Sequence, residues 1–180
     1  RPYFKKKIVI MGPESTGKST LTNKLSYQFN GDMVSEYGRE YTDKIPARAL
    51  NVKDFEKIAT EHLRKVEEVE ENGKSPFLFV DTEALITFSF GKMYLGKNFS
   101  SKIITDLIHE EDYDLVLLCN TDVPWVDDGT RDFKDHRETH FRMIKFLLDS
   151  YKMNLILLML MIHSFYYYYY KFLIIHCKIV

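Results

Sequence analysis

Cysteine is rare in this chain, and a net charge is almost absent. Cys119 and Cys177 lie far apart and outside any Cys-x-x-Cys spacing, which argues against a disulfide scaffold and a zinc cluster. The formal charge of −1 leaves no basic field that would hold DNA or RNA nonspecifically. The pattern of a secretory signal is also missing. We therefore expect a reducing, cytoplasmic setting and no nucleic-acid partner.

The length bounds the number of domains. A chain of 180 residues lies within the usual size of one domain and can bury about two-thirds of the surface that its unfolded form exposes. We expect one folded domain over residues 1–150 and a tail of different composition over residues 151–180. Because the chain begins with Arg1 rather than methionine, we also expect it to be part of a longer protein.

Apolar strands alternate with helices along the expected domain. Fully apolar strands that are separated by helices indicate a parallel sheet covered on both faces, with ligands at the carboxyl ends of the strands. Leu21, Leu25 and Phe29 illustrate the helical spacing of apolar residues. The predicted strands are 6–11, 33–35, 77–80 and 114–119, and the predicted helices are 18–29, 52–71, 85–94, 102–109 and 135–148.

A glycine-rich turn between the first strand and the first helix carries the strongest motif. Gly12-Pro13-Glu14-Ser15-Thr16-Gly17-Lys18-Ser19 fits the Walker A pattern. Its backbone N–H groups can surround phosphate oxygens, Lys18 can reach the β- and γ-phosphates, and the Ser19 hydroxyl can ligate Mg²⁺. The motif predicts an α/β, three-layer P-loop NTPase fold with a mainly parallel sheet. The predicted nucleotide-binding residues are Gly12, Pro13, Glu14, Ser15, Thr16, Gly17, Lys18, Ser19 and Thr20.

The strand over residues 77–80 is followed by Asp81, as a Walker B strand would be. This carboxylate would lie beside the phosphate-binding loop and hold Mg²⁺ through its water shell. Many strands end in aspartate, so the interpretation depends on the Walker A motif upstream. Ser19 and Asp81 are therefore the predicted metal ligands. Glu83 is a candidate for the same ion or for substrate hydroxyls.

The residues that read guanine are missing. Guanine-binding proteins place Asn-Lys-x-Asp after the next strand, whereas this chain has Asn120-Thr121-Asp122. Asp81-Thr82-Glu83-Ala84 also lacks the glycine of an Asp-x-x-Gly switch. We therefore favour an ATP-dependent enzyme that transfers a phosphoryl group over a GTPase switch.

Four motifs, taken in chain order, closely resemble the ribosylnicotinamide kinase domain of NadR-type proteins. They are Gly12 to Thr20, Glu36-Tyr37-Gly38-Arg39-Glu40-Tyr41, Asp81-Thr82-Glu83 and Trp125-Val126-Asp127-Asp128-Gly129-Thr130-Arg131. The second and fourth are much more specific than a Walker A sequence. The resemblance implies that the γ-phosphoryl group of ATP passes to the 5′-hydroxyl of nicotinamide riboside, which gives the mononucleotide for NAD biosynthesis.

Such a transfer needs a positioned hydroxyl, a carboxylate that takes its proton and cations around the γ-phosphate. Glu36 follows the second strand, where related nucleoside kinases keep an acidic residue, so it is the first candidate for the base and Asp81 is the second. Arg39 is expected to orient the ribose or the phosphoryl group, and Tyr37 and Tyr41 to wall the riboside pocket. The alternative for this segment is a solvated charged loop.

The polar stretch over residues 124–133 is predicted to be a mobile loop that closes over substrates. Closure would bring the guanidinium of Arg131 against the phosphates, and a surface salt bridge is the plainer alternative. Asp127 and Asp128 can hold ribose hydroxyls or the positive pyridinium ring. Trp125 can stack on that ring or belong to the core. The predicted catalytic residues are Lys18, Glu36, Asp81 and Arg131.

Two other functions fit the same motifs. A noncatalytic P-loop module that binds a nucleotide or a phospholipid would need neither a base at Glu36 nor a lid arginine at Arg131. A kinase of another small nucleoside would differ only in its acceptor pocket. Arg1-Pro2-Tyr3-Phe4 is similar to the connector that follows the adenylyltransferase domain in two-domain members, so that domain is an implied partner.

A pair of histidines suggests a metal site only superficially. His136 and His140 are four residues apart on a predicted helix. No third ligand lies nearby in the sequence, so we expect a solvated helix face.

The tail has an unusual composition. After Asp149 it contains no Asp, Glu, Gly, Ala, Pro or Arg. Residues 154–162 fit a last strand of the sheet. A membrane anchor needs about 20 apolar residues, and His163, Lys171 and the run from Tyr166 to Tyr170 interrupt this segment, so we do not expect an anchor. Our hypothesis is that the tail is translated out of frame from an A/T-rich gene.

Overall fold

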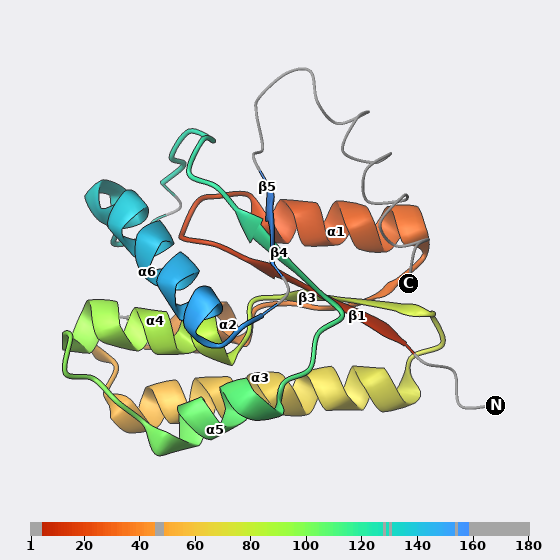
Figure 1. Ribbon diagram of the computed structural model, residues 1–180, viewed down its shortest axis with the longest axis horizontal. Helices are drawn as coiled ribbons and strands as arrows, with labels where there is room; N and C mark the ends of the chain where they lie inside the picture. The colour runs from red at the N-terminus through yellow and green to blue at the C-terminus, as the bar shows by residue number, and fades with distance from the viewer. Residues whose placement is uncertain (1–4, 46–48, 128, 130, 154, 159–180) are drawn as a thin grey trace.

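A five-stranded parallel sheet, with the strand order β2-β3-β1-β4-β5, forms the centre of the molecule (Figure 1). This computed structural model describes residues 5–45, 49–127, 129, 131–153 and 155–158. The strands are β1 (Lys6–Met11), β2 (Asp32–Val34), β3 (Phe77–Asp81), β4 (Leu115–Cys119) and β5 (Leu155–Leu158). Because β1 lies between β3 and β4, the loop that follows β1 emerges at the middle of the carboxyl edge of the sheet.

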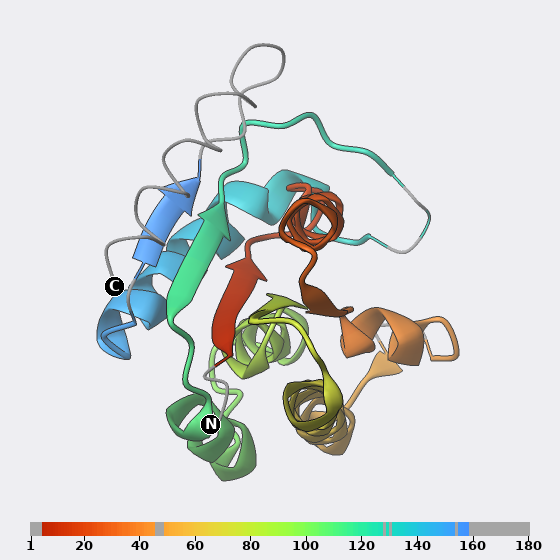
Figure 2. The ribbon, with the colours of Figure 1, turned by 90° about the vertical axis from the view of Figure 1, so that its right-hand side faces the viewer.

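Helices cover both faces of this sheet. Helix α1 packs through Leu25 against one face, where Ile8, Phe79 and Leu117 meet it. Helices α3 to α6 pack against the opposite face (Figures 1 and 2). The bounds are α1 (Lys18–Phe29), α2 (Tyr37–Thr42), α3 (Val52–Asn72), α4 (Ala84–Leu95), α5 (Lys102–Glu110), the 3₁₀ helix η2 (Lys134–His136) and α6 (Arg137–Ser150). The predicted three-layer α/β architecture is therefore confirmed.

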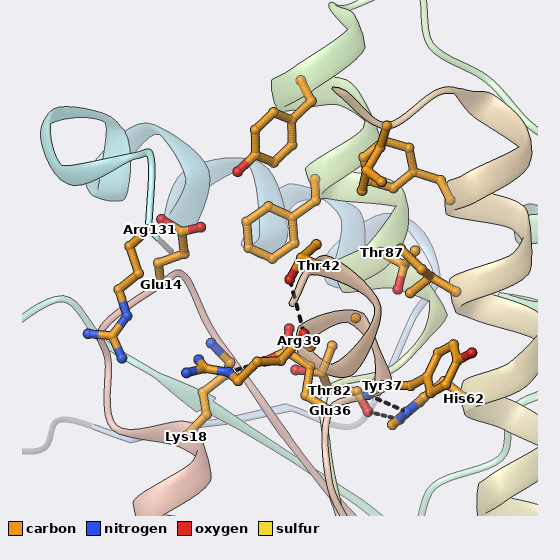
Figure 3. Close-up of a pocket in the computed structure, with 16 residues that line it drawn as sticks. Glu14, Lys18, Glu36, Tyr37, Arg39, Thr42, His62, Thr82, Thr87 and Arg131 are labelled. Carbon is orange, nitrogen blue, oxygen red and sulfur yellow. Dashed lines mark hydrogen bonds and ion pairs between the residues drawn. The ribbon is translucent and has the colours of Figure 1, made fainter. Parts of the chain in front are cut away.

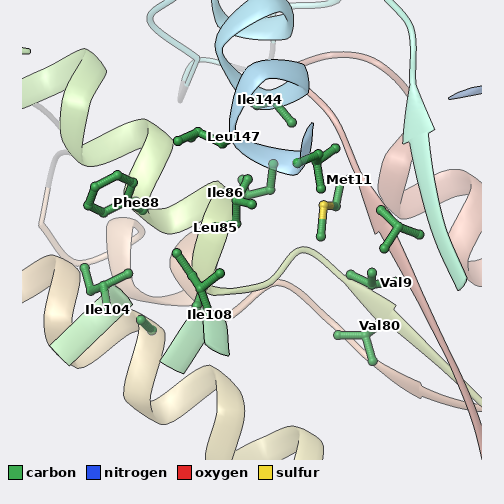
Figure 4. Packing of buried hydrophobic residues seen from close by; sticks show 14 of the residues in the cluster. Val9, Met11, Val80, Leu85, Ile86, Phe88, Ile104, Ile108, Ile144 and Leu147 are labelled. Atoms are coloured by element: carbon green, nitrogen blue, oxygen red, sulfur yellow. The ribbon is translucent and has the colours of Figure 1, made fainter. Parts of the chain in front are cut away.

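The main core lies between the sheet and helices α3 to α6 (Figure 4). Its strand residues come from β1, β2, β3 and β4, and its helix residues from α3, α4, α5 and α6. Members include Val9, Met11, Val80, Leu85, Ile86, Ile104, Ile108 and Ile144. This packing fixes the ends of β1 and β3, from which the phosphate-binding loop and Asp81 extend. Among the described residues, no helix is both long and apolar enough to cross a membrane.

The longest helix, α3, has clear signals at both ends. The side chain of Asn51 accepts a hydrogen bond from the amide of Lys53 at 2.9 Å, and the carboxylate of Asp54 accepts one from the amide of Asn51 at 2.9 Å. This capping box satisfies donors that the first helical turn leaves open. Gly73 follows the last turn. These caps hold the buried face of α3 against α4 and the sheet.

The structure departs from the sequence predictions in two places. The polar segment after the second strand, where no helix was predicted, forms the short helix α2. His140 is fully buried rather than solvated, with Nε2 2.7 Å from Ser89 Oγ, and burial lowers its pKa to about 3. His136 is exposed, as expected. A last strand is present as β5, whereas residues 159–180 and the connector at 1–4 lie outside the described residues.

Candidate active site

The loop between β1 and α1 is shaped by two glycines in the left-handed half of backbone space. Gly12 has φ 149°, and a Cβ there would lie 2.9 Å from the carbonyl oxygen of Cys119 and 2.9 Å from Thr16 Oγ1. Gly17, with φ 82°, is the residue that precedes α1. Only glycine adopts such turns without steric cost. The loop therefore delivers the open amides of the α1 N-terminus to the carboxyl edge, where they can bind an anion.

Lys18 lies at the base of this loop, and its side chain is almost fully buried. Its Nζ donates a hydrogen bond to the carbonyl of Pro13 at 2.8 Å. Ser19 is half-buried in the first turn of α1, and Thr20 is exposed. The loop thus holds its one lysine over the turn that would contain the phosphates.

Asp81 ends β3, directly beside β1, and is 2% exposed. Within the described part of the chain, no group of three or more His, Cys, Asp or Glu side chains could hold a metal ion. A cation at this edge would take the hydroxyl of Ser19, the carboxylate of Asp81 and further oxygens from phosphate and water. Hard oxygen donors in this small number are what Mg²⁺ uses in nucleotide sites, so the residues present fit that ion.

A cleft opens beside the phosphate-binding loop and encloses about 800 Å³, its open mouth included (Figure 3). Six predicted site residues line it, namely Glu14, Lys18, Glu36, Tyr37, Arg39 and Arg131. They come from the phosphate-binding loop, the start of α2 and the loop before η2. Three segments that are distant in the sequence therefore meet at one cleft.

Glu36 lies among four charged groups in this cleft. Its side chain is 18% exposed, and Arg39 Nε is 3.8 Å from its Oε2. Burial raises the pKa of Glu36, Lys18, Arg39 and Arg131 oppose the rise, and Asp81 adds to it. Both candidate bases are thus within electrostatic reach of each other and of the Walker lysine.

The loop before η2 is attached to the phosphate-binding loop. Arg131 Nη1 donates to Ser15 Oγ at 3.0 Å and also to the carbonyl of Val126. The amide of Val126 donates to Ser15 Oγ at 2.8 Å, and the amide of Phe133 donates to Glu14 Oε2 at 3.1 Å. This predicted lid therefore rests on Glu14 and Ser15, which places Arg131 at the cleft.

Trp125 is half-buried under the guanidinium of Arg137, whose Cζ is 5.7 Å from the centre of the indole ring. Arg137 Nη2 also donates to three carbonyl oxygens, among them those of Ser15 at 3.3 Å and Val123 at 2.9 Å. The indole face is thus in contact with an arginine, and Trp125 does not line the described cleft. This position differs from the predicted stacking on a substrate ring.

Three other predicted substrate residues also lie away from the lining of the described cleft. Tyr41 donates its hydroxyl proton to Asp54 Oδ1 at 2.8 Å. Glu83 is fully buried and accepts a hydrogen bond from the amide of Ile86 at 3.3 Å, so its carboxylate caps α4. Asp127 is exposed and accepts from the amide of Gly129. Asp128 lies outside the described residues.

Residues 7–160 match the family model of the AAA domain. The chain belongs to the AAA domain family. Among curated proteins, this AAA domain is 37% identical over 137 residues to the trifunctional NAD biosynthesis/regulator protein NadR of Escherichia coli (strain K12) and 36% identical to that of Salmonella typhimurium. These matches cover 73% of the chain and 32% of each relative. The chain thus spans about a third of the length of the curated relatives it matches.

Solved structures show the same fold. A NadR protein in complex with NR superposes with a TM-score of 0.76 at 25% identity, over 86% of this chain and 46% of that chain. Thymidylate kinase from Candida albicans superposes with a TM-score of 0.61 at 12% identity, over 89% of this chain and 85% of that chain. The P-loop kinase architecture and the resemblance to NadR are therefore both confirmed.

The AAA domain also has a cleft wall that the sequence motifs did not indicate. This wall combines apolar and aromatic side chains from α3, α4 and the residue Leu50 before α3 with two threonines and a buried histidine. Its members are Leu50, Phe55, Ile58, His62, Thr82, Thr87, Phe90 and Tyr94. In the sequence, Phe55 and Ile58 have the helical spacing of core residues. A periodic pattern cannot distinguish a residue that faces a cleft from one that faces the core, because both are on the same side of the helix.

Proposed function

We propose that this AAA domain is a kinase that transfers the γ-phosphoryl group of ATP to the 5′-hydroxyl of nicotinamide riboside, giving nicotinamide mononucleotide. The observation that carries the proposal is that Glu36 lines one cleft together with the Walker lysine Lys18 and Arg131, and that both cations act on its carboxylate. The similarity to NadR, and to a NadR structure solved with NR, supports the choice of substrate when NR is taken as nicotinamide riboside.

The nucleotide would bind at the loop over residues 12–20. The amides at the start of α1 and Lys18 Nζ would hold the β- and γ-phosphates. Ser19 and Asp81 would hold Mg²⁺, which when bound neutralises charge on the phosphate oxygens. The hydrogen bond from Lys18 to Pro13 would be exchanged for one to a phosphate oxygen.

The transfer itself joins the acceptor oxygen to the γ-phosphorus. The 5′-hydroxyl oxygen attacks, the bond from the γ-phosphorus to the bridging oxygen breaks, and ADP leaves with that bonding pair. Glu36 would take the hydroxyl proton, a role that suits a carboxylate whose pKa burial raises toward the working pH. Arg131 would balance the charge that spreads over the transferred oxygens, and Arg39 would orient the ribose or the phosphoryl group.

The acceptor end is suited to a flat cation. Phe55, Phe90 and Tyr94 provide an aromatic wall, and Glu14 and Glu36 add carboxylates. Aromatic faces and carboxylates both attract a pyridinium ring. This wall replaces Trp125 as the proposed partner of the nicotinamide ring.

Two alternatives make different predictions at this cleft. A noncatalytic nucleotide- or phospholipid-binding module has no use for a half-buried carboxylate beside the Walker lysine, so the position of Glu36 favours an enzyme. A kinase of another nucleoside keeps that carboxylate but gains nothing from the second carboxylate, that of Glu14, which also lines the cleft.

The test is ADP release from ATP and Mg²⁺ with a panel of acceptors, measured with a coupled assay. We expect turnover with nicotinamide riboside well above that with uridine or cytidine. Faster turnover with a neutral nucleoside would contradict the substrate assignment. Nucleotide binding without turnover on any acceptor would favour the binding module.

A further inference from the structure

A buried histidine on α3 joins the two segments that carry the acidic residues of the cleft. His62 is 3% exposed. Its Nε2 lies 2.9 Å from the carbonyl oxygen of Thr82, and its Nδ1 accepts a hydrogen bond from the amide of Tyr37 at 3.4 Å (Figure 3). Thr82 directly follows Asp81, and Tyr37 directly follows Glu36. The imidazole of His62 is thus hydrogen-bonded to the backbone of the residue that follows each carboxylate residue. We call these two hydrogen bonds the His62 bridge.

One neutral tautomer satisfies both contacts. A carbonyl oxygen can only accept, so Nε2 carries the proton and Nδ1 is left to accept from the amide. Burial lowers the pKa of His62, Lys65 adds to this effect, and Asp81 and Glu40 oppose it. The lowered pKa favours the neutral ring, and a charged ring would lose the acceptor that Tyr37 uses.

The Thr82 end of this bridge holds a strained turn. Thr82 has φ 74°, which is unusual for a β-branched residue. Its amide donates to the carbonyl of Ile10 at 3.0 Å, while its own carbonyl accepts from His62. Strain of this kind persists where the surroundings fix the backbone, and it is common at functional sites. The contact with His62 is thus one of those that hold the turn after Asp81.

At Tyr37, the hydrogen bond to His62 takes the place of a side-chain cap at the start of α2. Glu36 occupies the cap position of α2, yet its side chain makes no capping hydrogen bond. The amide of Tyr37 is among the donors that the first turn of a helix leaves open. Because His62 accepts from that amide, the carboxylate of Glu36 is left to face Lys18 and Arg39 in the cleft.

We propose that His62 is a positioning residue that fixes the carboxylates of Glu36 and Asp81 relative to each other through the two backbone turns behind them. This inference rests on the proposed kinase function for its catalytic consequence. Replacing His62 would let the start of α2 move against the end of β3. A displacement of about 1 Å at a reacting group can lower the rate by about 100-fold.

The kinetic test compares three substitutions of His62 with a matched control. His62→Leu removes both hydrogen bonds, His62→Gln can keep the donor to Thr82, and His62→Asn can keep the acceptor for Tyr37. Val66→Ala is the control, because Val66 is a buried residue one turn further along the same face of α3. We expect kcat to fall about 100-fold in His62→Leu and less in the two amide variants, with KM for ATP little changed. Val66→Ala should lower the melting temperature and leave kcat unchanged.

The inference is overturned if His62→Leu keeps the kcat of the wild type, or if its loss matches that of an equally destabilised Val66→Ala. A second measurement does not need turnover or a substituted chain. The ¹⁵N spectrum of the wild-type imidazoles should show His62 with protonated Nε2 and unprotonated Nδ1 throughout about pH 6 to 8. Protonation at Nδ1 in that range would contradict the bridge. A wild-type chain that phosphorylates no nucleoside, but shows this tautomer, would refute the kinase function and retain the bridge.

Discussion

At the residue scale, the proposed chemistry depends most on Glu36. We predict that Glu36→Gln lowers kcat by about 10²- to 10⁴-fold, because the amide cannot take the proton of the hydroxyl. ATP affinity should change little, since the phosphates are held by the loop over residues 12–20. Steady-state kinetics and titration with ATP measure the two quantities separately.

The control for this prediction is Glu40→Gln on the same short helix. Glu40 is exposed and forms an ion pair with Lys65 at 2.7 Å, so the substitution removes the same charge outside the cleft. Activity close to the wild type is expected for Glu40→Gln. If both variants lose the same small amount of activity, Glu36 is not the base.

Single residues also show which parts of the candidate site can be predicted from the sequence alone. Lys18, Glu36, Arg39 and Arg131 lie at the cleft as predicted, because each is placed by a local motif next to a strand end or helix start. The positions of Trp125, Tyr41 and Glu83 were not predictable in this way. The side chains of Trp125 and Tyr41 are oriented by distant partners, which are Arg137 and Asp54, whereas Glu83 accepts from the amide of Ile86 and caps α4. Local spacing does not indicate the partners that Trp125 and Tyr41 meet.

At the element scale, the start of α4 meets two carboxyl groups, that of its own cap residue Glu83 and that of Glu111, which follows α5. Glu83 accepts from the amide of Ile86, and Glu111 accepts from the amide of Ala84 at 3.2 Å. Burial raises the pKa of both groups, and the neighbouring charge of Glu83 raises that of Glu111 further. This arrangement indicates that the pair shares one proton. Because these pKa values are raised in the folded state, protonation contributes to the free energy of unfolding. This contribution is fully present below the ordinary pKa of glutamate and is lost as the pH rises through the raised pKa.

We predict that Glu111→Gln removes much of this dependence. The amide can accept from Ala84 and donate to Glu83 without titrating. The free energy of unfolding should therefore fall less steeply with rising pH than in the wild type, and should exceed the wild-type value at alkaline pH. Urea unfolding at a series of pH values measures the slope. Glu110→Gln, at the neighbouring exposed position, should keep the wild-type slope, and an unchanged slope in Glu111→Gln would exclude the shared proton.

At the scale of the whole molecule, the fold followed from the alternation of apolar strands and amphipathic helices. The exceptions have physical causes. Helix α2 has six residues, too few for a periodic pattern, and it depends on the contacts of Tyr37 with α3. The sequence left open whether the tail over residues 151–180 includes the last strand; β5 pairs in parallel with β4, and the family match reaches residue 160. We therefore propose that the domain includes β5. The out-of-frame origin of the tail stays a hypothesis for residues 159–180.

The position of β5 makes a prediction for shortened chains. A chain that ends after Leu158 keeps the pairing of Val116 to Cys119 with β5, whereas a chain that ends after Met153 loses it. An unpaired strand edge is destabilising and promotes aggregation. We expect the shorter chain to melt at least about 5 °C lower, as measured by circular dichroism. Equal melting temperatures would show that β5 is not part of the cooperative domain.

Whether the γ-phosphoryl group reaches the 5′-oxygen of nicotinamide riboside is the most direct question about the molecule. The measurement is ³¹P NMR of a reaction containing the chain, ATP, Mg²⁺ and nicotinamide riboside, with Lys18→Met as the inactive control. The account predicts a new phosphomonoester signal coupled to two 5′ protons, formed together with ADP and absent with Lys18→Met. ADP formed with inorganic phosphate alone, or a phosphomonoester coupled to one ring proton of the ribose, would contradict it.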